Sequence, residues 1–341
     1  MNLPTATSPS SSGAQTLAQL FMRIESGPGA AARVVAKIPT QRGWDDVPGW
    51  RFFRGVLRMG LWMGERGGLV PGERVVVIAP LRLERLVVEW ATVAQGGVVA
   101  VLDPTARDEA LDAALRRLSP RIVFAASPGD AGRVRGRVSA LGDSPHVVAV
   151  EGEVAGTGLS TWASVMDLAG TLDTAERAQA FRAASRAVRA EMPAVAHPVA
   201  GSAGAASWTV ATQGEVLGRL VELWNRYPPR RGDVAYAIDA GAPGRLRLAL
   251  WAFLADGMTT LALGTPTKLE DELLSLRPSV VAVPPHALAR MRGGPWREPV
   301  EPADPARTAF AWLARRLGRS MHEPPPARRI FTLEGEPRSL G

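Results

Sequence analysis

The feature that most constrains the fold is a regular alternation of short β-branched runs and longer amphipathic stretches. Residues 74–79, R-V-V-V-I-A, contain a continuous apolar run after the arginine, which is the pattern of a parallel strand covered on both faces. Further runs of this kind lie at residues 98–102, 121–126 and 146–150. Stretches with helical periodicity separate them, for example residues 83–95. The alternation predicts an α/β fold on a mainly parallel sheet flanked by helices.

The second part of the chain repeats this pattern. Strands are predicted at 234–238 and 259–263, with an apolar helix between them at 246–254. We therefore expect two lobes, each a mainly parallel sheet flanked by helices. The predicted divisions are a disordered leader at 1–15, a first α/β lobe at 16–150, a linker with helices at 151–194, a second α/β lobe at 195–292, and a Pro-rich segment with a helix and a terminal strand at 293–341.

Residues 199–216, V-A-G-S-A-G-A-A-S-W-T-V-A-T-Q-G-E-V, have the outline of a phosphate-holding loop. Gly201 and Gly204 let the backbone turn tightly and approach an anion. Ser202 and Ser207 supply the only side-chain hydroxyls between Gly201 and Trp208, and the stretch holds no lysine or arginine. A bare small-residue loop is weak evidence for phosphate binding.

This stretch resembles the loop T-S-G-T-T-G-x-P-K-G-V-x-x-T-H of the adenylate-forming superfamily, which includes acyl-CoA synthetases, luciferases and peptide-synthetase adenylation domains. Three positions of that loop are kept: Gly201, Gly204 and Thr212. The departures are severe, because Ser207 stands at the lysine, Trp208 at the third glycine, and Gln213 at the histidine. We therefore interpret Gly201, Ser202, Gly204, Ser207 and Thr212 as a vestigial phosphate loop.

An ordered set of segments extends the resemblance. T-L-A-Q-L-F, W-D-D, P-G-E-R-V-V-V-I-A-P, A-Q-G-G-V-V-A-V-L-D-P-T and R-I-V-F-A follow one another as in the opening lobe of fatty-acyl-CoA synthetases, and R-P-S-V-V-A-V-P resembles a later strand of that family. The resemblance covers about residues 16–341 and corresponds to the first half of a full enzyme. It implies an acyl pocket near Trp251, Val283 and His286, although core packing explains these apolar segments equally well. An unrelated doubly wound α/β domain remains an alternative.

Composition narrows the classes of function. The net charge is +7, but nearly all basic residues are arginines mixed with acidic residues, and Lys37 and Lys268 are the only lysines. This pattern indicates a solvated arginine-rich surface and not a nucleic-acid interface. The absence of cysteine and the four scattered histidines argue against a metal site. No apolar run approaches the roughly 20 residues that span a bilayer, and the N-terminus lacks a signal-peptide pattern, so we expect a cytoplasmic protein.

The resemblance leads to one principal expectation and two alternatives. The principal one is a truncated, catalytically inactive acyl-CoA synthetase-like protein that acts as a binding or scaffold subunit, with a protein partner over the face of the absent half and no cofactor. The first alternative is one half of a split fatty-acyl-CoA ligase, an acid–thiol ligase that would need a partner chain, ATP, Mg and CoA to form an acyl adenylate. The second is a nucleotide-independent fatty-acid or acyl-CoA binding protein.

Overall fold

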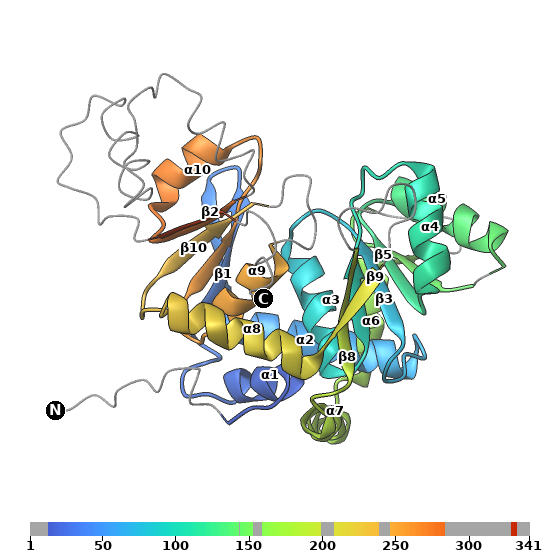
Figure 1. Cartoon of the computed structure of the whole chain (residues 1–341), viewed down its shortest axis with the longest axis horizontal. Helices are drawn as coiled ribbons and strands as arrows, with labels where there is room; N and C mark the ends of the chain where they lie inside the picture. The colour runs from blue at the N-terminus through green and yellow to red at the C-terminus, as the bar shows by residue number, and fades with distance from the viewer. Residues whose placement is uncertain are drawn as a thin grey trace, which may run out of the picture. The chain divides into compact units, whose positions relative to one another are not determined.

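The computed structural model describes residues 13–142, 144–152, 159–198, 208–238 and 246–283, together with the backbone of residues 329–332. These residues form two compact units, each described here by itself. Unit 1 takes its residues from the ranges 1–33 and 48–226, and unit 2 from 34–47 and 227–341. Figure 1 shows the elements with their labels.

Unit 1 is built on a seven-stranded sheet in the order β7-β6-β5-β3-β4-β8-β9. Its strands are β3 (Arg74–Ile78), β4 (Val98–Val101), β5 (Ile122–Ala125), β6 (His146–Ala149), β7 (Ser160–Thr161), β8 (Pro193–Pro198) and β9 (Trp208–Thr212). All neighbouring strands are parallel except β8 and β9, which form an antiparallel pair. The predicted mainly parallel α/β architecture is thus confirmed for this unit.

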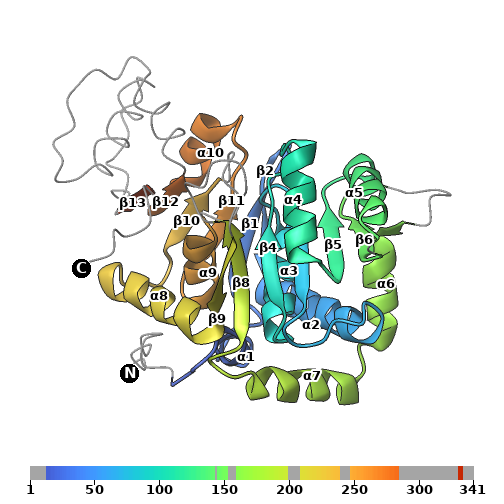
Figure 2. The same cartoon turned by 45° about the vertical axis from the view of Figure 1, so that its right-hand side comes forward.

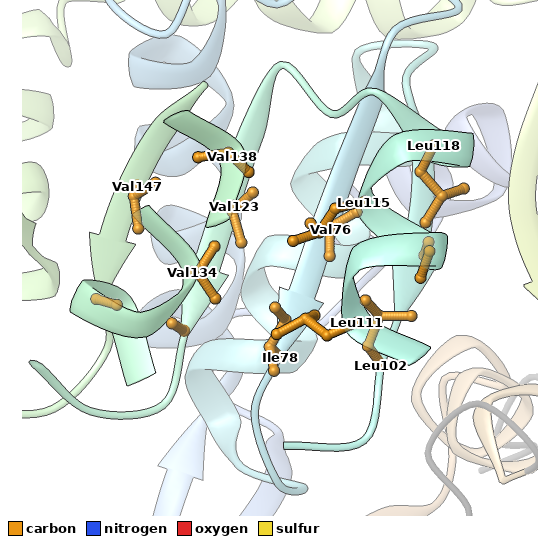
Figure 3. Packing of buried hydrophobic residues seen from close by; sticks show 14 of the residues in the cluster. Val76, Ile78, Leu102, Leu111, Leu115, Leu118, Val123, Val134, Val138 and Val147 are labelled. Atoms are coloured by element: carbon orange, nitrogen blue, oxygen red, sulfur yellow. The ribbon is translucent and has the colours of Figure 1, made fainter. Parts of the chain in front are cut away.

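Helices cover both faces of this sheet. They are α1 (Leu17–Glu25), α2 (Gly49–Glu65), α3 (Leu83–Ala94), α4 (Asp108–Leu118), α5 (Pro128–Ala140), α6 (Trp162–Leu172), α7 (Ala175–Ala187) and α8 (Gln213–Arg226). Helices α4 and α5 lie on one face, where Leu111, Leu115 and Val134 pack with Val76 and Val123 of the strands (Figure 3). The connection from β3 through α3 to β4 runs along the sheet in one direction, and the connection from β4 through α4 to β5 runs in the other. Because such crossovers are right-handed, α3 lies on the face opposite to α4.

Local sequence explains where several helices begin. The hydroxyl of Thr16 accepts a hydrogen bond from Gln19 N–H at 3.0 Å and caps α1. Ser127 and Asp130 form a reciprocal capping box at the start of α5. These caps satisfy backbone N–H groups that have no partner within the helix.

Unit 2 contains a six-stranded sheet in the order β13-β12-β10-β11-β1-β2. Its strands are β1 (Val34–Thr40), β2 (Gly43–Pro48), β10 (Val234–Ala237), β11 (Thr260–Leu263), β12 (Val280–Val283) and β13 (Arg329–Thr332), and its helices are α9 (Arg247–Ala255) and α10 (Leu269–Leu276). Pairs β1–β11, β10–β11, β10–β12 and β12–β13 are parallel. The central strand is β10, and the chain winds to β11 on one side of it and to β12 on the other.

The units differ from the contiguous lobes expected from the sequence. Residues 34–47 join the second sheet, because β1 pairs with β11 in parallel through Ala36↔Leu261 and Lys37↔Ala262. Residues 193–226 belong to unit 1, because β8 pairs with β4 through Val99↔Val195. In the part of the chain that the structure describes, no helix has the length and apolarity needed to span a membrane.

Candidate functional site

Strands β8 and β9 flank the glycine-containing loop that the sequence singles out. They pair antiparallel, with Pro198 opposite Trp208 and His197 opposite Thr209, so both ends of the loop are fixed at one point of the sheet (Figure 2). The predicted loop residues Gly201, Ser202, Gly204 and Ser207 lie outside the described residues. The described part of the candidate site therefore consists of the flanking strands and the start of α8.

Trp208 opens β9 directly after the loop. Its side chain is half-buried and packs against the hydrophobic cluster that α4 and α5 form with the sheet of unit 1. The sequence resemblance matches this position to the third glycine of the adenylate-forming loop, where a residue without a side chain lets the backbone approach a phosphate. Here the indole is part of the packing of the unit.

Thr212, the last residue of β9, caps helix α8. Its Oγ1 accepts a hydrogen bond from Glu215 N–H at 3.2 Å, and Glu215 Oε2 accepts one from Thr212 N–H at 2.8 Å. This reciprocal pair is a capping box, which satisfies two backbone donors at the start of the helix. The structure thus gives the predicted loop residue Thr212 a capping role.

Gln213, at the position of the family's histidine, is fully buried. Its Oε1 accepts from Ala18 N–H of α1 at 3.3 Å, and its Nε2–H donates to Val93 O of α3 at 3.0 Å. Ala18 lies in the first turn of its helix and Val93 in the last turn of its own, where backbone groups lack intrahelical partners. The Gln213 amide therefore joins the ends of two helices to the start of α8.

Two of the three residues of the predicted acyl pocket, Trp251 and Val283, lie in the described part of unit 2. Trp251 in α9 is fully buried, with the Arg247 guanidinium carbon 5.8 Å from its ring centroid. Val283 ends β12 and packs in the cluster that Leu269 and Leu273 of α10 form with the sheet of unit 2. The connection from β10 through α9 to β11 runs along that sheet in one direction, and the connection from β11 through α10 to β12 runs in the other. Because such crossovers are right-handed, α9 and α10 lie on opposite faces of the sheet. His286 lies outside the described residues.

Both lysines of the chain lie in unit 2. Lys37 lies in β1 and forms an ion pair with Asp46 of β2, both in unit 2, and Lys268 is exposed before α10. Strand β9 and the first residue of α8 carry no basic side chain. Within the described ranges, no three His, Asp or Glu side chains group so as to hold a metal ion.

A family model identifies the family of this chain. The family model described as "AMP-binding enzyme" matches residues 51–311. No curated protein matches the chain. Among solved structures, the luciferase-like enzyme of the mealworm Zophobas morio has a TM-score of 0.65 at 14% identity, over 82% of this chain and 62% of that one.

Two further structures carry the same fold. Apo MatB from Rhodopseudomonas palustris has a TM-score of 0.62 at 20% identity, over 81% of this chain and 51% of that one. The N-terminal domain of FACL13 from Mycobacterium tuberculosis, solved with an inhibitor, has a TM-score of 0.60 at 16% identity, over 85% of this chain and 68% of that one. The chain therefore spans about three-fifths of the length of the luciferase-like enzyme and about half of MatB.

Proposed function

This chain belongs to the AMP-binding enzyme family, and we propose that it is an acyl-CoA synthetase-like member that does not by itself convert a carboxylic acid and ATP into an acyl adenylate. In this proposal the chain acts as a binding or scaffold subunit for another protein. The fold likeness extends over the N-terminal part of the related enzymes, including the N-terminal domain of FACL13.

The single observation that carries the proposal is the replacement of the phosphate loop's lysine and third glycine by Ser207 and Trp208. Transfer of an adenylyl group develops negative charge on the phosphates, and enzymes stabilise it with positive charge and preorganised donors. A serine hydroxyl supplies no positive charge. A tryptophan that packs against the core of unit 1 takes the place of a glycine backbone that would approach the nucleotide.

The neighbouring positions support the same proposal. Gln213 uses both ends of its amide to hold backbone groups of α1 and α3, and the Thr212 hydroxyl accepts from Glu215 N–H. Two polar side chains that follow the loop are thus committed to joining secondary structure elements. The structural use of Gln213 accounts for its substitution at the histidine position without any contact to ATP.

A split ligase is the second candidate, because Gly201, Gly204 and Thr212 keep three positions of the family's loop. The chain spans 62% of the luciferase-like enzyme and 51% of apo MatB. A partner chain with the remaining elements would then be required for activity, together with ATP, Mg and CoA. This candidate predicts nucleotide-dependent binding despite Ser207 and Trp208, whereas the scaffold proposal predicts none.

Calorimetric titration of the purified chain separates these functions. We expect no heat with Mg-ATP at millimolar concentration and none with a non-hydrolysable fatty-acyl adenylate. Micromolar binding of the adenylate would overturn the proposal in favour of the split ligase. Binding of a fatty acid or acyl-CoA without nucleotide would instead indicate a lipid-binding protein, a role for which Trp251, Val283 and His286 are the residues to test.

A double substitution provides a matched comparison. Ser207→Lys combined with Trp208→Gly restores the family residues at the two positions. If the loop alone has lost nucleotide affinity, this variant gains measurable Mg-ATP binding while the wild-type chain shows none. Equal binding by both proteins would mean that the two residues do not decide nucleotide affinity.

A further inference from the structure

A buried carboxyl group lies at the carboxyl edge of the unit 2 sheet. Glu272 projects from α10, and its side chain is 6% exposed. Its Oε2 accepts two hydrogen bonds, from Tyr236 Oη–H at 2.9 Å and from Thr265 N–H at 2.7 Å. Tyr236 lies near the end of β10, and Thr265 follows the end of β11. The two donors therefore fix the carboxyl group where these neighbouring parallel strands end.

The second carboxyl oxygen is without a protein partner. Glu272 Oε1 is buried and makes no hydrogen bond within the part of the chain that the structure describes, and no ion pair to Glu272 occurs there. A buried acceptor without a donor is uncommon, because burying it removes its hydrogen bonds to water. Such a group calls for a donor from outside the described residues.

The position of this group in the fold is one where ligands bind. Strand β10 lies between β11 and β12, and the chain passes from β10 to β11 on one side and returns to β12 on the other. The winding direction thus reverses at β10. In open α/β sheets, ligands bind beyond the carboxyl ends of the strands at such a reversal.

The surroundings define the chemistry of the missing donor. Burial, and then the negative charge of Glu272 and its hydrogen bond, raise the pKa of the Tyr236 hydroxyl, so Tyr236 stays protonated and serves as a donor. The Trp44 ring lies edge-on to the Tyr236 ring, with centroids 6.4 Å apart, and Trp44 Nε1–H donates to Ser275 Oγ. A carboxylate that accepts from the hydroxyl of an aromatic side chain favours a cation that can also donate hydrogen bonds.

We propose that Glu272 Oε1, at the winding reversal of the unit 2 sheet, is a binding point for the ammonium group of a small primary amine. One N–H of the ammonium donates to Oε1, and its positive charge compensates the buried carboxylate. The aromatic ring of Tyr236, whose hydroxyl contacts Glu272, makes the surroundings suited to a compact cation. The test uses an amine and no nucleotide, so its outcome does not depend on whether the protein binds ATP.

Gly264 keeps the hydrogen-bonded arrangement in place. A Cβ at this position would overlap the Tyr236 ring, so a glycine between β11 and Thr265 lets the tyrosine reach Glu272. Its φ angle is not in the left-handed region, so the requirement for glycine here is the close approach of the ring. Gly264 is thus a positioning residue for the carboxyl group.

The test is a titration of the full chain with methylammonium, followed by the NMR signals of tryptophan side-chain N–H groups, with acetate as the anionic control. We expect saturable shifts of the Trp44 signal with methylammonium and none with acetate. Glu272→Gln should weaken methylammonium binding at least about tenfold, because its amide places a donor where the ammonium needs an acceptor. Glu270→Gln, at an exposed position of the same helix, should leave the affinity unchanged.

A second variant keeps the proposal testable if Glu272→Gln does not fold. Tyr236→Phe preserves the ring and removes the hydroxyl donor, and it should bind methylammonium at least as tightly as the wild-type chain. The absence of saturable shifts in the wild-type chain would overturn the proposal and leave a buried water as the partner of Oε1. Equal affinities in Glu272→Gln and the wild-type chain would overturn it as well.

Discussion

Replacement of Gln213 by methionine tests whether this residue is structural. Methionine has a similar length and no hydrogen-bonding amide, so the change removes both amide contacts with little change of volume. The buried Ala18 N–H loses its acceptor, which costs about 1–3 kcal/mol. Val93 O keeps a bond from Gly96 N–H at 3.1 Å, so the loss there is only about 1 kcal/mol.

We therefore expect Gln213→Met to lower the free energy of unfolding of unit 1 by about 2–4 kcal/mol. Urea denaturation measured by circular dichroism gives this quantity from the midpoint and slope, fitted as two transitions if the two units unfold separately. Gln41→Met, at an exposed position, is the matched control and should change the free energy by less than about 0.5 kcal/mol. A loss below about 0.5 kcal/mol for Gln213→Met would refute the reasoning, because two buried hydrogen bonds cannot then contribute as described.

Three further substitutions probe other parts of the structure. Arg85→Met removes the guanidinium that donates to the buried Glu89 carboxylate at 2.8 Å. We expect the free energy of unfolding measured in urea to fall by about 3–5 kcal/mol. An unchanged denaturation midpoint would contradict a buried ion pair. Gly264→Ala should lower the free energy of unfolding by about 1–3 kcal/mol in a thermal unfolding experiment, because the added methyl group overlaps the Tyr236 ring. A variant as stable as the wild-type chain would show that the ring moves freely. Thr212→Ala should cost about 1 kcal/mol by loss of the α8 cap, whereas Thr212→Ser should keep most of that stability.

The central strands were predictable because their signal is local. Residues 74–79 and 121–126 each contain a continuous apolar run after an initial arginine, and the structure places buried strands there as β3 and β5. Strand β9 escaped prediction because it is an edge strand in which Thr209 and Val210 are exposed, so it shows no apolar run. The assignment of residues 34–47 to unit 2 depends on pairing with β11, more than 200 residues away in sequence.

The candidate site was predictable in its location more than in its contacts. The glycines of residues 199–216 and the resemblance in their spacing located the loop between two elements. The role of Gln213 could not be predicted, since its two partners lie 195 and 120 residues away in sequence. For the same reason nothing local indicated that Glu272 would contact Tyr236, which lies 36 residues earlier.

The most direct test of the central claim is pyrophosphate exchange into ATP by the purified chain in the presence of Mg and a panel of fatty acids. Adenylate formation breaks the bond between the α- and β-phosphates, and its reversal carries labelled pyrophosphate back into ATP. With Ser207 and Trp208 in the loop, we predict exchange at the level of a protein-free control. Exchange above that level that depends on a fatty acid would contradict the account and show that this chain activates acids by itself.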